Sequence, residues 1–160
     1  MITLPDFDKQ WEFENNFYLT CDVSRIGKFL VHYELFKMTK DIPGDIVECG
    51  VFKGLSLIRF VTFINLLVKP PTTKRLIAFD TFDEFPDTEF VEDRQKRDEF
   101  VGSAGGHSIG KEQLQKVLTR KGTVQGDICE TVPNYVHEHP ISKSHSSTWI
   151  PTSTNRRLWP

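Results

Sequence analysis

Apolar residues recur along the chain at two different spacings, and these spacings predict the order of its helices and strands. Between Cys21 and Lys40 they return every three or four residues, which is the period of a helix with one buried face. Asp22 or Ser24 can cap the start of this helix. The breakers that follow it, Pro43 and Gly44, predict that it ends there.

Three strand–helix units are predicted to follow this helix. Each begins with a short β-branched or apolar run and continues into a longer stretch with helical spacing. The expected strands are Asp45–Cys49, Arg75–Asp80 and Thr123–Gln125, and the expected helices are Ser56–Val68, Lys111–Arg120 and Glu130–His139. A long polar loop over Thr81–Gly110 separates the second strand from its helix, with a helical piece near Glu92–Phe100.

Strands that alternate with helices predict an α/β fold with a parallel sheet and right-handed crossovers. We expect an N-terminal arm over residues 1–20 that packs irregularly on the domain. The α/β domain itself is expected over residues 21–140. Residues 141–160 are rich in Ser, Thr and Arg, have no periodicity, and are expected to be irregular.

Composition and charge argue against several classes of partner and location. The 160 residues carry a net charge of -2 with no basic cluster, so nucleic acid is not an expected partner. The longest apolar stretch, Leu55–Val68, is interrupted by Arg59 and Asn65, so no membrane span is predicted. No secretory signal follows Met1, and the three cysteines are widely spaced, which favours reduced thiols in the cytoplasm.

The turn after the first strand carries the clearest chemical signal. In open α/β sheets ligands bind beyond the carboxyl ends of the strands, where this chain has Glu48, Gly50, Gly54 and Ser56. Phe52 stands where a dinucleotide-binding motif has its second glycine, which disfavours a pyrophosphate ligand. S-adenosylmethionine has no pyrophosphate, and its amine and carboxylate suit an acid and a helix N-terminus. A plain glycine turn that only joins strand to helix is the alternative.

The ends of the next two strands add acidic residues. Asp80 follows the second strand and is suitably placed to accept hydrogen bonds from ribose hydroxyls. Gly126 and Asp127 follow the third, where the glycine could admit an adenine ring and the carboxylate could accept from its amino group. The alternatives are an exposed turn aspartate at position 80 and a helix N-cap at position 127.

Three blocks of this sequence closely resemble the macrocin O-methyltransferase family of sugar-modifying enzymes. They are Pro43–Gly54, Ala78–Phe82 with Pro86, and Gly126–Ile128 with Thr131–Pro133. The resemblance implies a Rossmann-like class I methyltransferase fold and transfer of a methyl group from S-adenosylmethionine to a hydroxyl of a sugar or other small molecule. It implies cofactor contacts at Glu48, Gly50, Ser56, Asp80 and Asp127, and Val51, Phe52, Gly54, Thr81 and Gly126 complete the expected binding set. It also implies a lid or substrate loop over Asp83–His107.

The chain departs from the family after the third unit. Family members have a fourth strand that ends in a carboxylate motif, and carboxylates from there onward hold Mg²⁺. Ile141–Pro160 contains no Asp or Glu, so the metal ligands are expected to be absent and the sheet to be incomplete at its C-terminal side. One hypothesis is a frame slip near Lys143, since codons permitted for Ser144–Ser153, read two bases further along, can encode an apolar strand followed by Asp-Thr-Tyr. The nucleotide sequence tests it.

Few residues can serve as a catalytic base. His107 in the polar loop is the candidate, with an ordinary surface histidine as the alternative, and we expect no metal site. The chain could therefore be an inactive fragment, or a non-catalytic S-adenosylmethionine- or nucleotide-binding module. A nicotinamide-dependent oxidoreductase is disfavoured by Phe52. An incomplete sheet leaves an open edge, which predicts poor solubility or a homo-oligomer.

Overall fold

Four parallel strands form the centre of the computed structural model, which describes residues 1–69, 74–121, 126–129 and 148–149. The strands are β1 (Ile46–Cys49), β2 (Leu76–Phe79), β3 (Gly126–Cys129) and β4 (Thr148–Trp149), in the spatial order β3-β2-β1-β4. Ile46 pairs with Leu76 and with Thr148, and Leu76 pairs with Gly126. The carboxyl ends of β1, β2 and β3 therefore meet at one edge of the sheet.

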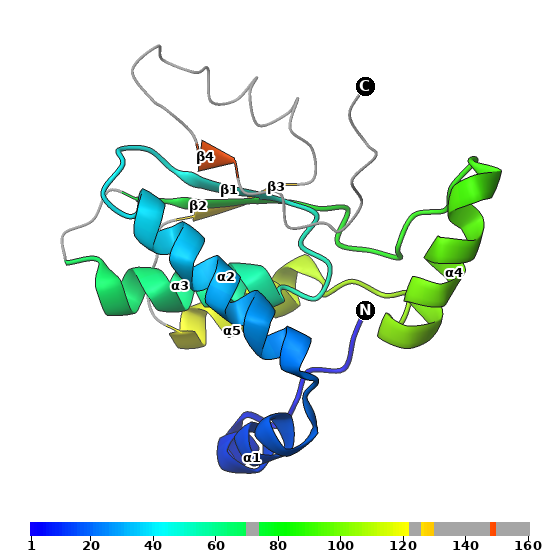
Figure 1. The fold of residues 1–160 in the computed structure, drawn as a ribbon, viewed down its shortest axis with the longest axis horizontal. Coiled ribbons are helices and arrows are strands. Elements are labelled where there is room, and N and C mark those ends of the chain that lie inside the picture. The colour runs from blue at the N-terminus through cyan, green and yellow to red at the C-terminus, as the bar shows by residue number, and fades with distance from the viewer. Residues whose placement is uncertain (70–73, 122–125, 130–147, 150–160) are drawn as a thin grey trace.

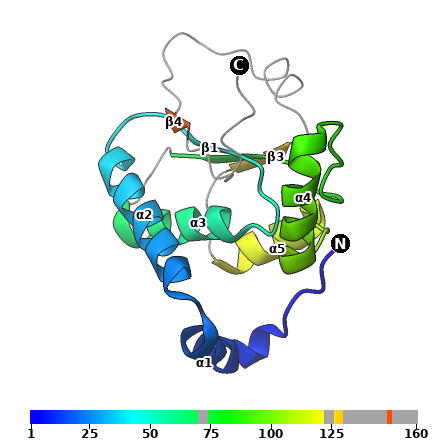
Figure 2. The same ribbon diagram turned by 45° about the vertical axis from the view of Figure 1, so that its right-hand side comes forward.

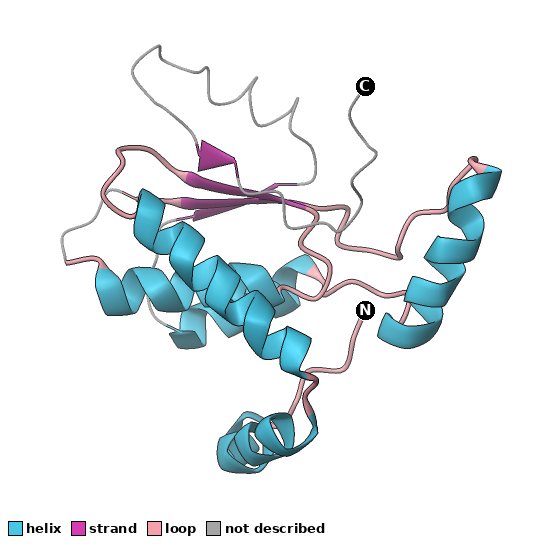
Figure 3. Ribbon diagram, in the orientation of Figure 1, coloured by secondary structure: helices cyan, strands magenta, loops and turns pink. Residues whose placement is uncertain are grey.

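The helices fall into three groups (Figure 1). Those that pack on one face of the sheet are α2 (Val23–Thr39), α3 (Leu55–Leu67) and α5 (Lys111–Lys121). Helix α4 (Val91–Ala104) stands beyond the carboxyl ends of the strands. The N-terminal η1 (Phe7–Lys9) and α1 (Gln10–Thr20) lie on the far side of α2 from the sheet (Figure 3).

The main core lies between the sheet and its layer of helices. Helix α3 is apolar around much of its circumference and buries Leu57, Phe60, Phe63 and Ile64 against α2 and β2. Phe36 of α2 is fully buried and lies 5.7 Å from Phe63, centroid to centroid. Because each such side chain contributes about 1.5–3 kcal/mol on burial, this cluster holds the helices to the sheet.

Strands β1 and β2 are apolar on both faces, as parallel strands usually are. Successive side chains alternate, so Ile46, Leu76 and Ala78 join the core under the helices. Val47, Ile77 and Phe79 form a second buried cluster, with Cys49 packed against it. Glu48 is the exception in this pattern, because its side chain belongs to the face of the main core and is a carboxylate.

The structure confirms the predicted α/β class, the first helix, the first two strands and the helices after them. Each boundary agrees to within two residues, and the helical piece expected near Glu92–Phe100 is α4, which extends a little further at both ends. The helix expected over Glu130–His139 lies outside the described residues.

Three expectations differ from the structure. Gly126 and Asp127, expected to follow the third strand, lie inside β3, because pairing along the edge of β2 outweighs the low strand propensity of glycine and aspartate. The expected strand residues Thr123–Gln125 lie outside the described residues. Part of the N-terminal arm is helical, as η1 and α1. The tail contributes a two-residue strand, β4, along the open edge of β1.

None of the described helices combines the length and the apolar character that a membrane span requires.

Candidate functional site

The turn between β1 and α3 is built on three residues with left-handed backbone conformations. Gly50 has φ 83°, Phe52 has φ 51° and Gly54 has φ 77°. The Gly50 N–H donates to the Phe79 carbonyl at 2.8 Å, and the Gly54 N–H donates to the Val51 carbonyl at 2.9 Å. A side chain at Gly54 would strain the backbone and would come within 3.1 Å of Leu114. These contacts bring the start of α3 to the edge where β1 and β2 end.

Gly50 and Gly54 differ in what surrounds them. Gly54 is buried at the N-cap of α3, against α5, so it serves close packing. Gly50 is exposed, and a Cβ there would meet nothing within 4 Å. Open space at Gly50 leaves the backbone accessible to a ligand, next to the first N–H groups of α3, which have no partner within the helix.

Glu48 lies beneath this turn. Its side chain is fully buried, and Ser56 in the first turn of α3 donates its hydroxyl to Glu48 Oε1 at 2.5 Å. A carboxylate below the N-terminus of a helix is favoured by the helix dipole, which is positive at that end. The turn therefore combines a buried carboxylate with the N-terminal end of a helix.

Asp80, the residue after β2, holds two loops together. Its Oδ2 accepts the Phe52 N–H at 2.8 Å, and its Oδ1 accepts the Phe82 N–H at 2.9 Å and the Thr81 hydroxyl at 3.4 Å. Phe82 also has a left-handed backbone, with φ 56°. A non-glycine residue in this region costs about 1–2 kcal/mol, and the bonds to Asp80 offset that cost at both phenylalanines. Oδ2, which accepts one of these bonds, still has capacity for a further donor.

The segment between β2 and α5 folds back on itself and rests on the turn. The Phe85 N–H donates to the Gly106 carbonyl at 2.7 Å, and the Ser108 N–H donates to the Asp83 carbonyl at 3.0 Å. At the base of this segment, the Ile109 N–H donates to the Phe52 carbonyl at 2.8 Å. The excursion that carries α4 is therefore anchored at both of its ends.

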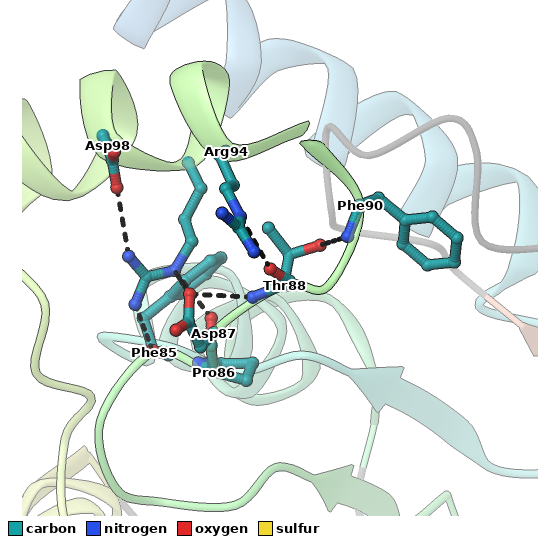
Figure 4. A network of polar contacts seen from close by, with 8 residues as sticks. Phe85, Pro86, Asp87, Thr88, Phe90, Arg94 and Asp98 are labelled. Atoms are coloured by element: carbon teal, nitrogen blue, oxygen red, sulfur yellow. Dashed lines mark hydrogen bonds and ion pairs between the residues drawn. The ribbon is translucent and has the colours of Figure 1, made fainter. Parts of the chain in front are cut away.

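Arg97 organises the first half of that excursion (Figure 4). Its guanidinium donates to the Pro86 carbonyl at 2.9 Å and to the Phe85 carbonyl at 3.3 Å. It also lies 3.1 Å from Asp98 Oδ1 and 3.5 Å from Asp87 Oδ1. These contacts fix α4 to the loop that leads into it.

His107 lies on the surface, where its Nδ1 is 3.7 Å from Glu84 Oε1. The two residues also form an isolated antiparallel bridge between their backbones. The structure thus places His107 beside Glu84 at the base of the α4 excursion.

The structure also locates the other residues expected from the sequence. Val51 is buried in the main core and Thr81 is exposed. Gly126 and Asp127 lie within β3, in register with Leu76 and Ile77, and not beyond its carboxyl end. The structure brings Glu48, Gly50, Phe52, Ser56 and Asp80 together at the sheet edge.

The structure also shows the surroundings of two cysteines and of the candidate metal ligands. Cys21 and Cys49 are half-buried free thiols, and burial, with a smaller contribution from Glu48, raises the pKa of Cys49. Within the part of the chain that the structure describes, no three His, Cys, Asp or Glu side chains gather closely enough to hold a metal ion. The segment 141–147, where the resemblance led us to expect the start of the family's carboxylate region, lies outside that part.

Sequence reasoning missed the residues that join α4 to the turn. The rings of Phe52, Phe85 and Phe100 contact one another, and the Lys53 ammonium donates to the Ala104 carbonyl. The available signal was the recurrence of phenylalanine in an otherwise polar segment, at positions 82, 85, 90 and 100. Because phenylalanine is often buried, this recurrence could have indicated a local apolar contact, which Phe85 and Phe100 make and the exposed Phe90 does not.

Known proteins resemble this chain both in sequence profile and in fold. The sequence profile of the macrocin-O-methyltransferase (TylF) family matches residues 28–131, well over half of the chain. A crystal structure of CalS11, a calicheamicin methyltransferase, is similar with a TM-score of 0.60 and 25% identity, over 81% of this chain and 55% of that one. The apo structure of CalS11, described as a TDP-rhamnose 3'-O-methyltransferase of calicheamicin biosynthesis, gives a TM-score of 0.57 at 24% identity over 82% and 54%.

The chain spans about half the length of these solved structures. No curated protein matches it by sequence.

Proposed function

Since the chain belongs to the macrocin O-methyltransferase family, we propose that its sheet edge binds S-adenosylmethionine and that the complete site methylates a hydroxyl of a small-molecule sugar. The observation that carries the proposal is the turn at Gly50, which sets open backbone and a helix N-terminus above the buried carboxylate of Glu48. The cofactor carries an amine, a carboxylate and a sulfonium, and each has a complementary group at this edge.

The proposed contacts follow from the chemistry of each residue. The N-terminus of α3 favours the cofactor carboxylate, and Glu48 supplies negative potential near its cationic groups. Asp80 is the acceptor for the ribose hydroxyls, in addition to its two backbone bonds. The remaining members of the proposed set are Gly50, Val51, Phe52, Gly54, Ser56, Thr81, Gly126 and Asp127.

Methyl transfer is an in-line displacement in which the cofactor supplies an electrophilic methyl group. The protein must hold the acceptor oxygen about 3 Å from the methyl carbon and must help remove the hydroxyl proton. His107 remains the proposed base, paired with Glu84 at the margin of the site. Among the described residues, no cluster of His, Cys, Asp or Glu side chains fits Mg²⁺.

A second function from another class is favoured by one observation. Residues 141–160 contain no Asp or Glu, although the family has its carboxylate motif in this region. A chain that keeps the cofactor turn and lacks those carboxylates would bind S-adenosylmethionine without transferring its methyl group.

The test that separates the two functions uses TDP-rhamnose, the acceptor named for CalS11, with S-adenosylmethionine and MgCl₂. Mass spectrometry of the sugar nucleotide should detect the addition of one methyl group if the chain is an enzyme. A matched reaction with Asp80→Ala should give less product. Binding of S-adenosylmethionine with no methylated sugar, even at stoichiometric protein, would contradict catalysis by this chain and support the binding module.

A further inference from the structure

Outside the loop that leads into it, helix α4 is contacted by the side chains of two adjacent turn residues, Phe52 and Lys53. We propose that Phe52 and Lys53 are positioning residues that seat α4, so that the position of α4 depends on the state of the turn between β1 and α3. The seat itself is independent of any ligand. The part of the proposal that concerns the cofactor rests on the proposed function.

The first contact is an aromatic cluster drawn from three segments. The Phe52 ring lies 5.3 Å from the ring of Phe100 in α4 and 5.9 Å from that of Phe85 in the loop after β2, centroid to centroid. Phe85 and Phe100 lie 5.1 Å apart. All three rings are half-buried. Ring pairs at these distances add to the free energy of burial, so the cluster favours one position of α4 over others.

The second contact is about one turn further along α4, at its C-terminal end. The Lys53 ammonium donates to the carbonyl of Ala104, the last residue of the helix. A cation is stabilising at a helix C-terminus, where the dipole is negative and the last carbonyls lack helical partners. The same ammonium lies 5.4 Å from the centroid of the Phe52 ring, so the two seat residues also support each other.

Helix α4 has little else to hold it. None of its residues is buried, and its first turn carries Glu92 and Asp93. The Arg97 contacts bind α4 to its own leading loop, through the carbonyls of Phe85 and Pro86. They do not reach the turn. A helix of this length is marginally stable by itself in water, so loss of the seat should release α4.

The seat residues belong to a backbone that a ligand at the turn would contact. Phe52 has φ 51°, its N–H donates to Asp80 Oδ2, and its carbonyl accepts from Ile109. A change in the backbone of Phe52 would therefore move its ring and shift the contact with Phe100. A ligand that favours one state of the turn favours one position of α4 by the same free energy.

The location of α4 links this coupling to the binding of the acceptor. The helix stands past the carboxyl ends of the strands, beside the turn, in both orientations of the molecule (Figures 1 and 2). An acceptor must approach the proposed cofactor from this edge. Cofactor binding would thus set the wall of the acceptor site before the acceptor arrives.

Hydrogen–deuterium exchange read by mass spectrometry tests the seat without ligand. Phe100→Ala and Lys53→Met should each raise amide exchange in α4 about tenfold, with β1 and α3 unchanged. Phe90→Ala is the matched control, because Phe90 precedes the same helix and is 66% exposed. A thermal melt confirms that each variant keeps its fold. Exchange in α4 that stays at the wild-type rate in both Phe100→Ala and Lys53→Met would overturn the seat.

Repeating the experiment with S-adenosylmethionine tests the coupling. In the wild type, exchange should slow in the turn and in α4, whereas in Phe100→Ala it should slow in the turn alone. Protection of the turn without α4 in the wild type would overturn the coupling and leave the proposed function intact. Protection of neither would contradict the proposed function and the coupling together, while the ligand-free comparison would still decide the seat.

Discussion

The carboxylate of Asp80 accepts the backbone N–H of Phe52 at 2.8 Å, across a sequence separation of 28 residues. This bond joins the turn after β1 to the end of β2. It also holds Phe52 in a left-handed conformation that phenylalanine seldom adopts. Asp80, which the sequence predicts to face a ribose, therefore has a structural role in joining these two segments.

Asp80→Ala should lower the free energy of unfolding by about 1–3 kcal/mol, because two backbone N–H groups lose a charged acceptor. Urea denaturation measures the change. Asp80→Asn should recover part of the loss, since one oxygen remains as an acceptor. Asp83→Ala, a nearby exposed position, serves as the control and should change stability by less than about 0.5 kcal/mol. Equal effects at positions 80 and 83 would refute the role of the bond.

Two glycine-to-alanine substitutions should have opposite effects. Gly54→Ala should destabilise the protein by about 1–3 kcal/mol, because φ is 77° and the new methyl group would lie 3.1 Å from Leu114. Gly27→Ala, inside α2, meets nothing within 4 Å and should stabilise by about 0.5–1 kcal/mol through higher helix propensity. Thermal melts of both variants report the sign, and a stabilising Gly54→Ala would contradict the packing described for the turn.

Buried His32 should make stability depend on pH. Its ring is 5% exposed and stacks on Phe60 at 5.4 Å. Burial first, and then the positive charges of Arg59 and Lys28, lower the pKa of His32 from 6.5 to about 4. Between these values the unfolded chain takes up a proton that the folded protein does not. The free energy of unfolding should therefore fall as the pH drops from 6.5 to 4, by at most about 3 kcal/mol.

Urea denaturation at a series of pH values between 4 and 7 measures this dependence. His32→Leu should remove the His32 component, whereas His107→Gln, which changes an exposed histidine, should leave it in place. An unchanged slope in His32→Leu would show that the burial of His32 is not its cause.

The ion pair between Asp45 and Arg75 should contribute more than a surface pair. Asp45 is 8% exposed and accepts from Arg75 Nη2 at 2.6 Å and Nε at 3.2 Å. Asp45→Asn should cost about 1–3 kcal/mol, because the guanidinium loses its bidentate partner at the entry to β1 and β2. Glu34→Gln breaks the exposed pair with Lys37 and should cost less than about 0.5 kcal/mol. Equal losses would contradict the assignment.

The parts of the fold that follow from local pattern were predictable. The helical spacing at Phe29, Tyr33 and Phe36 predicted α2, and the apolar runs around Val47 and Ile77 predicted two buried strands. Gly50 and Gly54 predicted a tight turn, because left-handed backbone is easily reached only by glycine.

The parts that depend on contacts distant in sequence were not predictable. Glycine and aspartate at 126–127 favour a loop by propensity, but the free edge of β2 draws them into β3. The left-handed Phe52 and Phe82 have no local signature, since Asp80 stabilises both through bonds made only in the folded state. The seat of α4 joins Phe52 to Phe100, and only the tertiary fold brings these two rings together.

The central claim is that the sheet edge at Glu48, Gly50 and Asp80 binds S-adenosylmethionine. Isothermal titration calorimetry of the purified chain with S-adenosylmethionine, S-adenosylhomocysteine and NAD tests it most directly. We predict saturable binding of the first two at one site, weaker binding to Asp80→Ala, and no heat of binding with NAD. Absence of binding to both S-adenosyl compounds by the folded chain, or tighter binding of NAD, would contradict the claim.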